Sequence, residues 1–239
     1  MNKTFYLLIL IMVAGCNSPS PKGNFPEPKA SFKQNTDTAI TLSREQYYNK
    51  VLGMLVGSTI GDAMGAPTEM WDRTSIEVQK GYVDSLDLVV REHSPEGPWL
   101  TNMPAGSTTD DTRWKHLGVQ YLLTQAQDSL NPFDFAKHIL AVYDLEMESL
   151  SEKPTDYERI AQKFSHITWL IEWVKVAKPF TEEDLIGYNV QLSKFYGGEM
   201  SCAGMLYAPV IGAYFPGMPA KSYQQAYGLS IFDIGYARD

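Results

Sequence analysis

The sequence predicts an all-α fold, and three observations support this prediction. Apolar residues recur at three- and four-residue spacing in several segments, and capping residues precede some of these segments. No stretch sustains the strict alternation that is typical of a half-buried strand. With 239 residues, 44% of them hydrophobic, the chain can bury a sizeable core.

The first fifteen residues have the pattern of an export signal. Lys3 precedes an apolar run over residues 5–13, and small residues lead into Cys16. The run is too short to span a bilayer. Its ending, VAGC, resembles the lipobox of bacterial lipoproteins, which implies a signal peptide over residues 1–15 and a lipid on Cys16. We therefore expect a lipid-anchored protein of the bacterial cell envelope, facing the periplasm or the surface; an ordinary signal peptide is the alternative.

A flexible tether is expected to follow. Residues 17–42 carry four prolines among polar residues and show no apolar periodicity. We assign residues 16–42 to the lipidated cysteine and its tether, and residues 43–239 to a helical domain.

The domain is expected to begin at Ser43, because Ser43 and Gln46 have capping-box spacing ahead of a helical pattern. Within this helix four glycines recur at every fourth position and share one face: Gly53, Gly57, Gly61 and Gly65. Because each glycine weakens a helix, we expect another helix or a ligand to approach this face closely.

The middle of the chain is expected to alternate irregular and helical segments. Residues 71–106 contain glycines and prolines with short apolar runs, and we expect an irregular segment there. The apolar spacing from Trp114 predicts a helix, and Asn131-Pro132 predicts the start of the next.

The last third of the chain is expected to hold three further helices. Thr155 and Glu158 have capping-box spacing ahead of an amphipathic pattern, in which Trp169 and Trp173 favour core packing over stacking on a ligand. Thr181 is a plausible cap for a short helix, and residues 220–239 are expected to form the final one.

The charge of the chain argues against nucleic acid as a partner. The net charge is -8 and the basic residues are scattered rather than gathered into a stripe.

Two adjacent aspartates stand where a helix is predicted to begin, in the sequence TTDDT at residues 108–112. One interpretation is structural: Thr109 or Asp110 caps the helix, and acids suit its first turn. The other is that Thr109, Asp110 and Asp111 present a hydroxyl and two carboxylates to hard divalent cations. The sequence alone is compatible with both interpretations.

A second acidic motif is GSTIGDAMGAPTE at residues 57–69, which carries Asp62 and Glu69. These acids could lie on an approachable surface beside the glycines. Alternatively, Gly65 and Pro67 simply end a helix.

Together the two motifs resemble the ADP-ribosylglycohydrolases, relatives of the dinitrogenase-reductase-activating glycohydrolase. GMLVGSTIGDAMGAPTEMW at residues 53–71 is similar to the family's opening helix and acidic loop, and AGSTTDDTRW at residues 105–114 to its first metal motif. The likeness extends over residues 44–239.

The resemblance implies an all-α, orthogonal multi-helix bundle that holds two Mg²⁺ or Mn²⁺ ions. It implies Thr109, Asp110 and Asp111 as metal ligands, and Glu69, Asp110 and Asp111 as catalytic residues. The implied reaction is hydrolysis of an N- or O-glycosidic bond between ADP-ribose and an acceptor, on an ADP-ribosylated substrate. Carboxylates and metals suit such a bond, because they assist the leaving group and stabilise an oxocarbenium-like state.

A glycine-rich segment at residues 196–212 occupies the place of the family's substrate loop. Backbone N–H groups at Gly197 and Gly198 could meet a diphosphate, and Asp62 is also expected to contact substrate. A tight connection between buried helices is the alternative.

The family's second acidic motif, Gly-x-Asp-x-Asp-Thr, has no match after Trp114. We therefore expect the domain to be incomplete at its C-terminus. A second hypothesis follows from this departure: a non-catalytic, lipid-anchored domain that binds ADP-ribose or is a relic of the enzyme.

Overall fold

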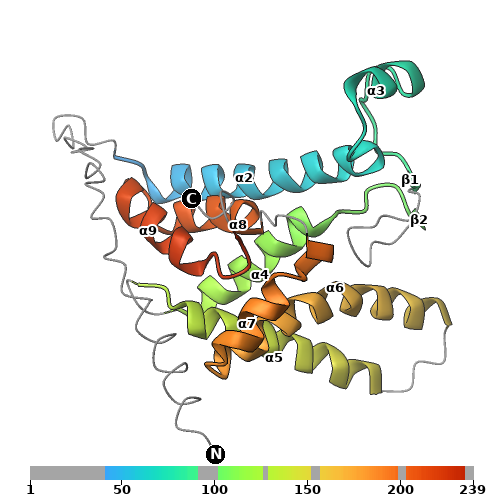
Figure 1. Cartoon of the computed structure of the whole chain (residues 1–239). Coiled ribbons are helices and arrows are strands. Elements are labelled where there is room, and N and C mark those ends of the chain that lie inside the picture. The colour runs from blue at the N-terminus through green and yellow to red at the C-terminus, as the bar shows by residue number, and fades with distance from the viewer. Residues whose placement is uncertain (1–40, 91–101, 126–128, 152–156, 199–202, 235–239) are drawn as a thin grey trace, which may run out of the picture. The chain divides into compact units, whose positions relative to one another are not determined.

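A computed structural model describes residues 41–90, 102–125, 129–151, 157–198 and 203–234 (Figure 1). The chain divides into two units, Met1–Leu42 and Ser43–Asp239, and the second unit contains the elements that follow. The predicted signal peptide, Cys16 and nearly all of the predicted tether lie outside the described residues.

The predicted all-α class is confirmed. Eight α-helices form the described part of the second unit: α2 (Arg44–Gly65), α3 (Arg73–Gln79), α4 (Asp110–Thr124), α5 (Pro132–Ser151), α6 (Tyr157–Thr181), α7 (Leu185–Leu192), α8 (Ala203–Tyr214) and α9 (Pro219–Leu229). Two short 3₁₀ helices, η1 (Ala66–Thr68) and η2 (Phe195–Gly198), accompany them. The described strands are β1 (Val89–Val90) and β2 (Asn102–Met103), which pair antiparallel. None of the described helices is both long enough and apolar enough to cross a membrane.

Helix α2 begins at the predicted capping box. The Ser43 hydroxyl accepts a hydrogen bond from the Gln46 backbone N–H at 3.1 Å, and the Gln46 side chain accepts one from the Ser43 N–H at 2.9 Å. These two bonds satisfy donors that a helix start leaves without partners. Helix α2 then packs against α4, which brings the first acidic motif to the second (Figure 1).

The expected close approach of another helix to the glycine face of α2 is not seen among the described residues, and an approach by a ligand stays a prediction. Side chains built at Gly53, Gly57, Gly61 and Gly65 would meet no described atom within 4 Å. The helix instead buries Ala63 and packs Met54 and Leu55 against the core. The four glycines therefore lie on a face of α2 that the other described residues do not cover.

Because the face is open, Gly57→Ala is expected to stabilise the protein. Alanine favours the helix by about 1 kcal/mol over glycine, and the added methyl group meets no described atom. Urea unfolding of the two proteins measures this gain. A loss of stability instead would show that something packs closely on this face.

The core is built around two stacked tryptophans on α4 and α6. The rings of Trp114 and Trp173 lie 3.4 Å apart at 17°, and both side chains are fully buried. Tyr207 of α8 and Phe232 complete an aromatic cluster around Trp114. Core packing of Trp173 is thus confirmed, whereas the Trp169 side chain lies outside the described residues.

Helices α4 and α5 begin where the sequence predicts. Helix α4 buries Trp114 and its apolar face, and α5 starts at Pro132, where the Asn131 carboxamide oxygen accepts from the Phe133 N–H at 2.8 Å. The predicted capping residue Thr155 falls outside the described residues.

Three predictions about the positions of helices are wrong. Helix α3 lies within the segment predicted to be irregular, with Asp72 as its N-cap. Thr181 ends α6 rather than capping α7: Glu183 takes a left-handed conformation at φ 57°, and the Asp184 N–H bonds to the Pro179 carbonyl at 2.9 Å. Helix α9 ends at Leu229, because the following residues turn into the core, where Asp233 accepts from the Gly204 N–H at 2.7 Å.

Candidate active site

Asp62, near the end of α2, joins the two acidic motifs through its carboxylate. Its oxygens accept from the Thr109 N–H at 3.1 Å and hydroxyl at 2.8 Å, and from the Thr112 N–H at 3.1 Å and hydroxyl at 2.6 Å. These residues stand 47 and 50 positions away in the sequence. A single carboxylate therefore holds the first turn of α4 against α2, and we call this set of bonds the Asp62 clamp.

Thr109 is the N-cap of α4, as the structural interpretation of TTDDT predicts. Its hydroxyl oxygen accepts from the Asp111 N–H at 3.3 Å while its proton goes to Asp62. A hydroxyl oxygen has two lone pairs, so this arrangement leaves one for a further partner. The cap is therefore compatible with a ligand role for the same oxygen.

Asp110 is a buried carboxyl group with little positive charge around it. Burial raises the pKa of Asp110 to about 7, and the negative charges of Asp111 and Glu69 contribute to the rise. Arg113 offsets only part of the effect. At neutral pH this carboxyl group thus lies near its midpoint between the acid and the carboxylate.

Asp111 lies more openly, one residue further along α4. Its carboxylate faces the Lys115 ammonium group at 3.8 Å, one turn along the helix, and 42% of its side chain is exposed. The Lys115 side chain is only 14% exposed, but at this length the pair contributes little to stability. Asp111 is therefore accessible to a ligand from solvent.

Glu69 follows η1 and is half-buried. The next residue, Met70, has a left-handed backbone at φ 66°, so the chain turns sharply just after the acid. The charge of Glu69 acts on Asp110, so the structure brings the acid of the first motif to the aspartates of the second.

The donors at the start of α4 fit a hard cation in kind. Mg²⁺ prefers oxygen ligands and is commonly held through one or two carboxylates, with waters completing its octahedron. Asp110 and Asp111 supply two carboxylates, and the Thr109 hydroxyl has its proton on Asp62. Within the described ranges no three His, Cys, Asp or Glu side chains lie close enough to form a metal cluster, so these residues alone do not make a closed two-ion cage.

Gly197 and Gly198 lie in η2, between α7 and α8. Both have positive φ, at 77° and 87°, in a segment where Tyr196 is also left-handed at φ 48°. Residues 199–202 of the predicted substrate loop lie outside the described residues. Gly204 is buried in α8 beside Asp233 and Ser230, which is a packing role.

Sequence reasoning missed three residues of this region: Thr112, Arg113 and Tyr196. Thr112 is the second threonine of the clamp, and its position three residues after Thr109 is the one signal that could have pointed to it. Arg113 and Tyr196 each interact electrostatically with Asp110. Arg113 stands one turn after Asp110 on α4, whereas no local pattern indicates a partner as distant in the sequence as Tyr196.

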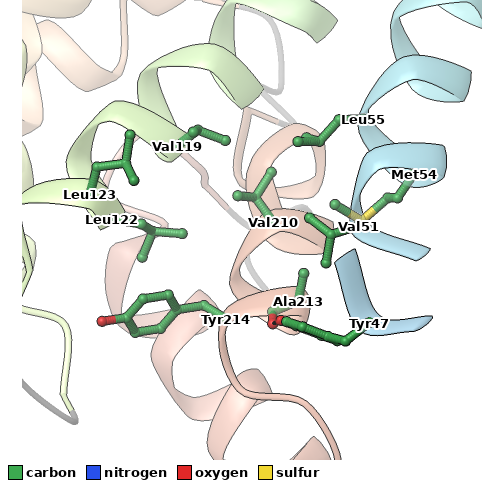
Figure 2. A pocket seen from close by; sticks show the side chains of 10 residues that line it. All are labelled: Tyr47, Val51, Met54, Leu55, Val119, Leu122, Leu123, Val210, Ala213 and Tyr214. Atoms are coloured by element: carbon green, nitrogen blue, oxygen red, sulfur yellow. Dashed lines mark hydrogen bonds between the residues drawn. The ribbon is translucent and has the colours of Figure 1, made fainter. Parts of the chain in front are cut away.

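Two pockets flank α4, and they differ in chemistry. One, of about 170 Å³, lies between α4, α5 and α6 and includes Thr112, Arg113, His116 and Glu146 in its lining. The other, of about 180 Å³, lies between α2, α4 and α8 (Figure 2). Its lining is Tyr47, Val51, Met54, Leu55, Val119, Leu122, Leu123, Val210, Ala213 and Tyr214. No charged side chain and no predicted site residue lines this apolar pocket, so it is not the catalytic site.

Comparisons with known proteins agree with the arrangement of the two motifs. A protein-family model described as ADP-ribosylglycohydrolase matches residues 43–238, which include every described helix. No curated protein and no solved structure matches the chain significantly.

Proposed function

The chain belongs to the ADP-ribosylglycohydrolase family, and from this premise we propose that it hydrolyses the glycosidic bond between ADP-ribose and an acceptor in a metal-dependent reaction. The family acts on ADP-ribosylated substrates and is generally metal-dependent. The observation that carries the proposal is the Asp62 clamp, because it brings Glu69, Asp110 and Asp111 into one acidic site.

The reaction breaks the bond between the anomeric carbon of the ribose and the nitrogen or oxygen of the acceptor. Water supplies the hydroxyl group that remains on the ribose, and the acceptor leaves with a proton. Glycosidic hydrolysis needs carboxyl groups that donate and accept protons, and a negative surrounding that stabilises an oxocarbenium-like state. Glu69 and the two aspartates provide both, and we assign Glu69 to proton transfer at the scissile bond.

Thr109, Asp110 and Asp111 would hold Mg²⁺ or Mn²⁺. A bound divalent cation polarises substrate oxygens and lowers the pKa of water. Asp110 is buried among like charges, so a cation beside it would relieve their repulsion. Asp62 keeps the hydroxyl and the two carboxylates in place by fixing both flanking threonines. A role for Asp62, Gly197 or Gly198 in binding substrate stays a prediction.

One experiment tests the proposal with the full chain. ADP-ribose release is measured from substrates that carry ADP-ribose on arginine and on serine, with Mn²⁺ and with a chelator. Activity is expected with Mn²⁺ alone, and Asp111→Asn is expected to lower it by about two orders of magnitude, because it removes a ligand. Asp144→Asn is the matched control, an exposed acid on α5 whose change is expected to leave the rate intact. Full activity in the chelator, or in Asp111→Asn, would refute metal dependence at this site.

A second candidate function is the binding of ADP-ribose without hydrolysis. The observation that favours it is the absence of a three-ligand cluster among the described residues. This function predicts saturable binding of ADP-ribose with no turnover of either substrate.

The lipid anchor at Cys16 and a place in the bacterial cell envelope remain proposals. They are supported by the VAGC sequence at residues 13–16 and the apolar run before it.

A further inference from the structure

A third pocket lies where the start of α5, the end of α6 and the start of α7 meet. Its volume is about 320 Å³, which reaches the lower end of the range for small-ligand sites, about 300 to 1,000 Å³. Three aromatic rings, two aliphatic side chains and two carboxylates line it. None of the predicted site residues is among them, so this pocket is separate from the candidate active site.

The aromatic side chains of this pocket are Phe133, Phe180 and Tyr188, and all three are half-buried. The ring centroids of Phe180 and Tyr188 lie 5.2 Å apart at an interplanar angle of 56°, so the two rings present surfaces at an angle rather than one flat stack. The face of an aromatic ring attracts cations. Phe133 already shows this property, because the ammonium group of Lys137, which does not line the pocket, lies 4.5 Å from its ring centroid.

The carboxylates of this pocket belong to Glu183 and Asp184, which are both exposed. Glu183 has a left-handed backbone at φ 57° just after α6, a position where glycine is the usual residue. One Asp184 carboxylate oxygen accepts from the Gly187 N–H at 2.9 Å and so caps α7. The start of a helix carries a partial charge of only about +0.5, which two full negative charges outweigh. No basic side chain stands among the described residues that line the pocket, so its charge favours a cation.

A ligand that matches this pocket carries a positive charge and an apolar surface. A quaternary ammonium group combines the two: methyl groups surround its charge, it has no N–H that needs an acceptor, and aromatic faces recognise it. A metal ion would instead need several oxygen ligands, and one of the two carboxylates already caps α7. We propose that the pocket binds a trimethylammonium compound of the choline class, with its methyl groups against Phe133, Phe180 and Tyr188 and its charge facing Glu183. This inference is independent of the proposed hydrolysis.

The test is the binding of choline to the full chain, measured by isothermal titration calorimetry beside its neutral isostere, in which carbon replaces the nitrogen. We expect saturable binding of choline and about tenfold weaker binding of the isostere, which has no charge to place over the rings. Phe180→Leu is expected to raise the Kd for choline by about fivefold, because it removes one ring face. Tyr48→Leu is the control: it removes an exposed ring on α2, and its Kd is expected to stay within about twofold of the wild type. Circular dichroism spectra show whether each protein is folded.

A folded wild-type chain without saturable choline binding would overturn the inference, and so would equal affinity for the isostere or an unchanged Kd in folded Phe180→Leu. If Phe180→Leu does not fold, Glu183→Gln decides, because it changes only an exposed side chain. It is expected to raise the Kd by about threefold at low salt, and Asp144→Asn, which removes an exposed acid outside the pocket, is expected to leave it unchanged. An unchanged Kd in Glu183→Gln then overturns the inference.

Phosphatidylcholine vesicles distinguish a free compound from a lipid headgroup as the source of the trimethylammonium group. Sedimentation with these vesicles above that with phosphatidylglycerol vesicles, reduced in Phe180→Leu, would identify the headgroup. Binding of choline without this preference would identify a free compound. Both results support a trimethylammonium site in this pocket.

Discussion

Asp110→Asn is expected to abolish ADP-ribosyl hydrolysis and, in the absence of divalent cations at pH 8, to make the protein more stable. The loss of activity is expected to reach about three orders of magnitude, because the change removes a carboxylate that both cations and the reaction need. The gain in stability follows from the buried position of Asp110 among negative charges. Asparagine keeps the shape of the side chain without its charge.

The sign of the pH dependence follows from the raised pKa. Asp110 has a pKa of about 7 in the folded protein, whereas in the unfolded chain it is about 3.9. Between these pH values Asp110 holds a proton in the folded state that it has released in the unfolded state. The contribution of Asp110 to stability is therefore complete below about pH 4 and is lost as the pH rises through 7. The loss amounts to about 4 kcal/mol at pH 8.

Urea unfolding of wild type and Asp110→Asn at pH 4 and pH 8, in chelator, measures this difference. The free energies of unfolding are expected to be similar at pH 4, and at pH 8 the variant should be more stable by about 2 to 4 kcal/mol. Asp144→Asn controls for the loss of one exposed charge. Equal stability of wild type and Asp110→Asn at pH 8 would mean that ionisation of Asp110 does not destabilise the folded protein.

Asp62→Ala is expected to destabilise the domain by about 3 to 4 kcal/mol, because it removes the acceptor of the whole clamp. The N–H and hydroxyl groups of Thr109 and Thr112 lose their partner together, and Thr109 is only 3% exposed. Buried donors left without acceptors carry the full cost of their lost hydration. Urea unfolding gives the free energy, and amide hydrogen exchange at Thr109 and Thr112 should accelerate more than elsewhere on α4.

Asp62→Asn separates the clamp from general packing. The carboxamide oxygen can accept from one threonine. The NH₂ group is itself a donor, so it cannot accept from the backbone N–H of the other threonine, and that N–H is left without an acceptor. We expect about half the cost of the alanine change. If both variants were as stable as Asp144→Ala, the clamp would not hold the two motifs together.

Local features of the fold could be predicted from the sequence. The capping box at Ser43 and the start of α5 at Pro132 depend on neighbours within a few residues, so their patterns are visible in the chain. Boundaries that depend on distant contacts could not be predicted. Helix α9 ends shortly before Asp233, whose carboxylate accepts from the Gly204 N–H of α8, and no neighbouring residue in the sequence indicates that contact.

The candidate site shows the same division. The two acidic motifs could be found because their residues are contiguous, and the cap at Thr109 follows from its place before two acids. The partners of Asp62 lie 47 and 50 residues away, so their pairing appears only in the folded chain. Tyr196 is further still, and its left-handed backbone contradicts the propensity of a bulky residue. The regular spacing of the glycines in α2 predicted a close packing partner, and none of the described residues packs against them.

Anomalous diffraction from crystals of the full chain soaked with Mn²⁺ tests directly whether a divalent cation binds at the start of α4. We expect an anomalous peak within coordination distance of Asp110 and Asp111, and no peak in crystals of Asp110→Asn. An active protein whose Mn²⁺ binds elsewhere, or leaves no peak beside these two aspartates, would contradict it.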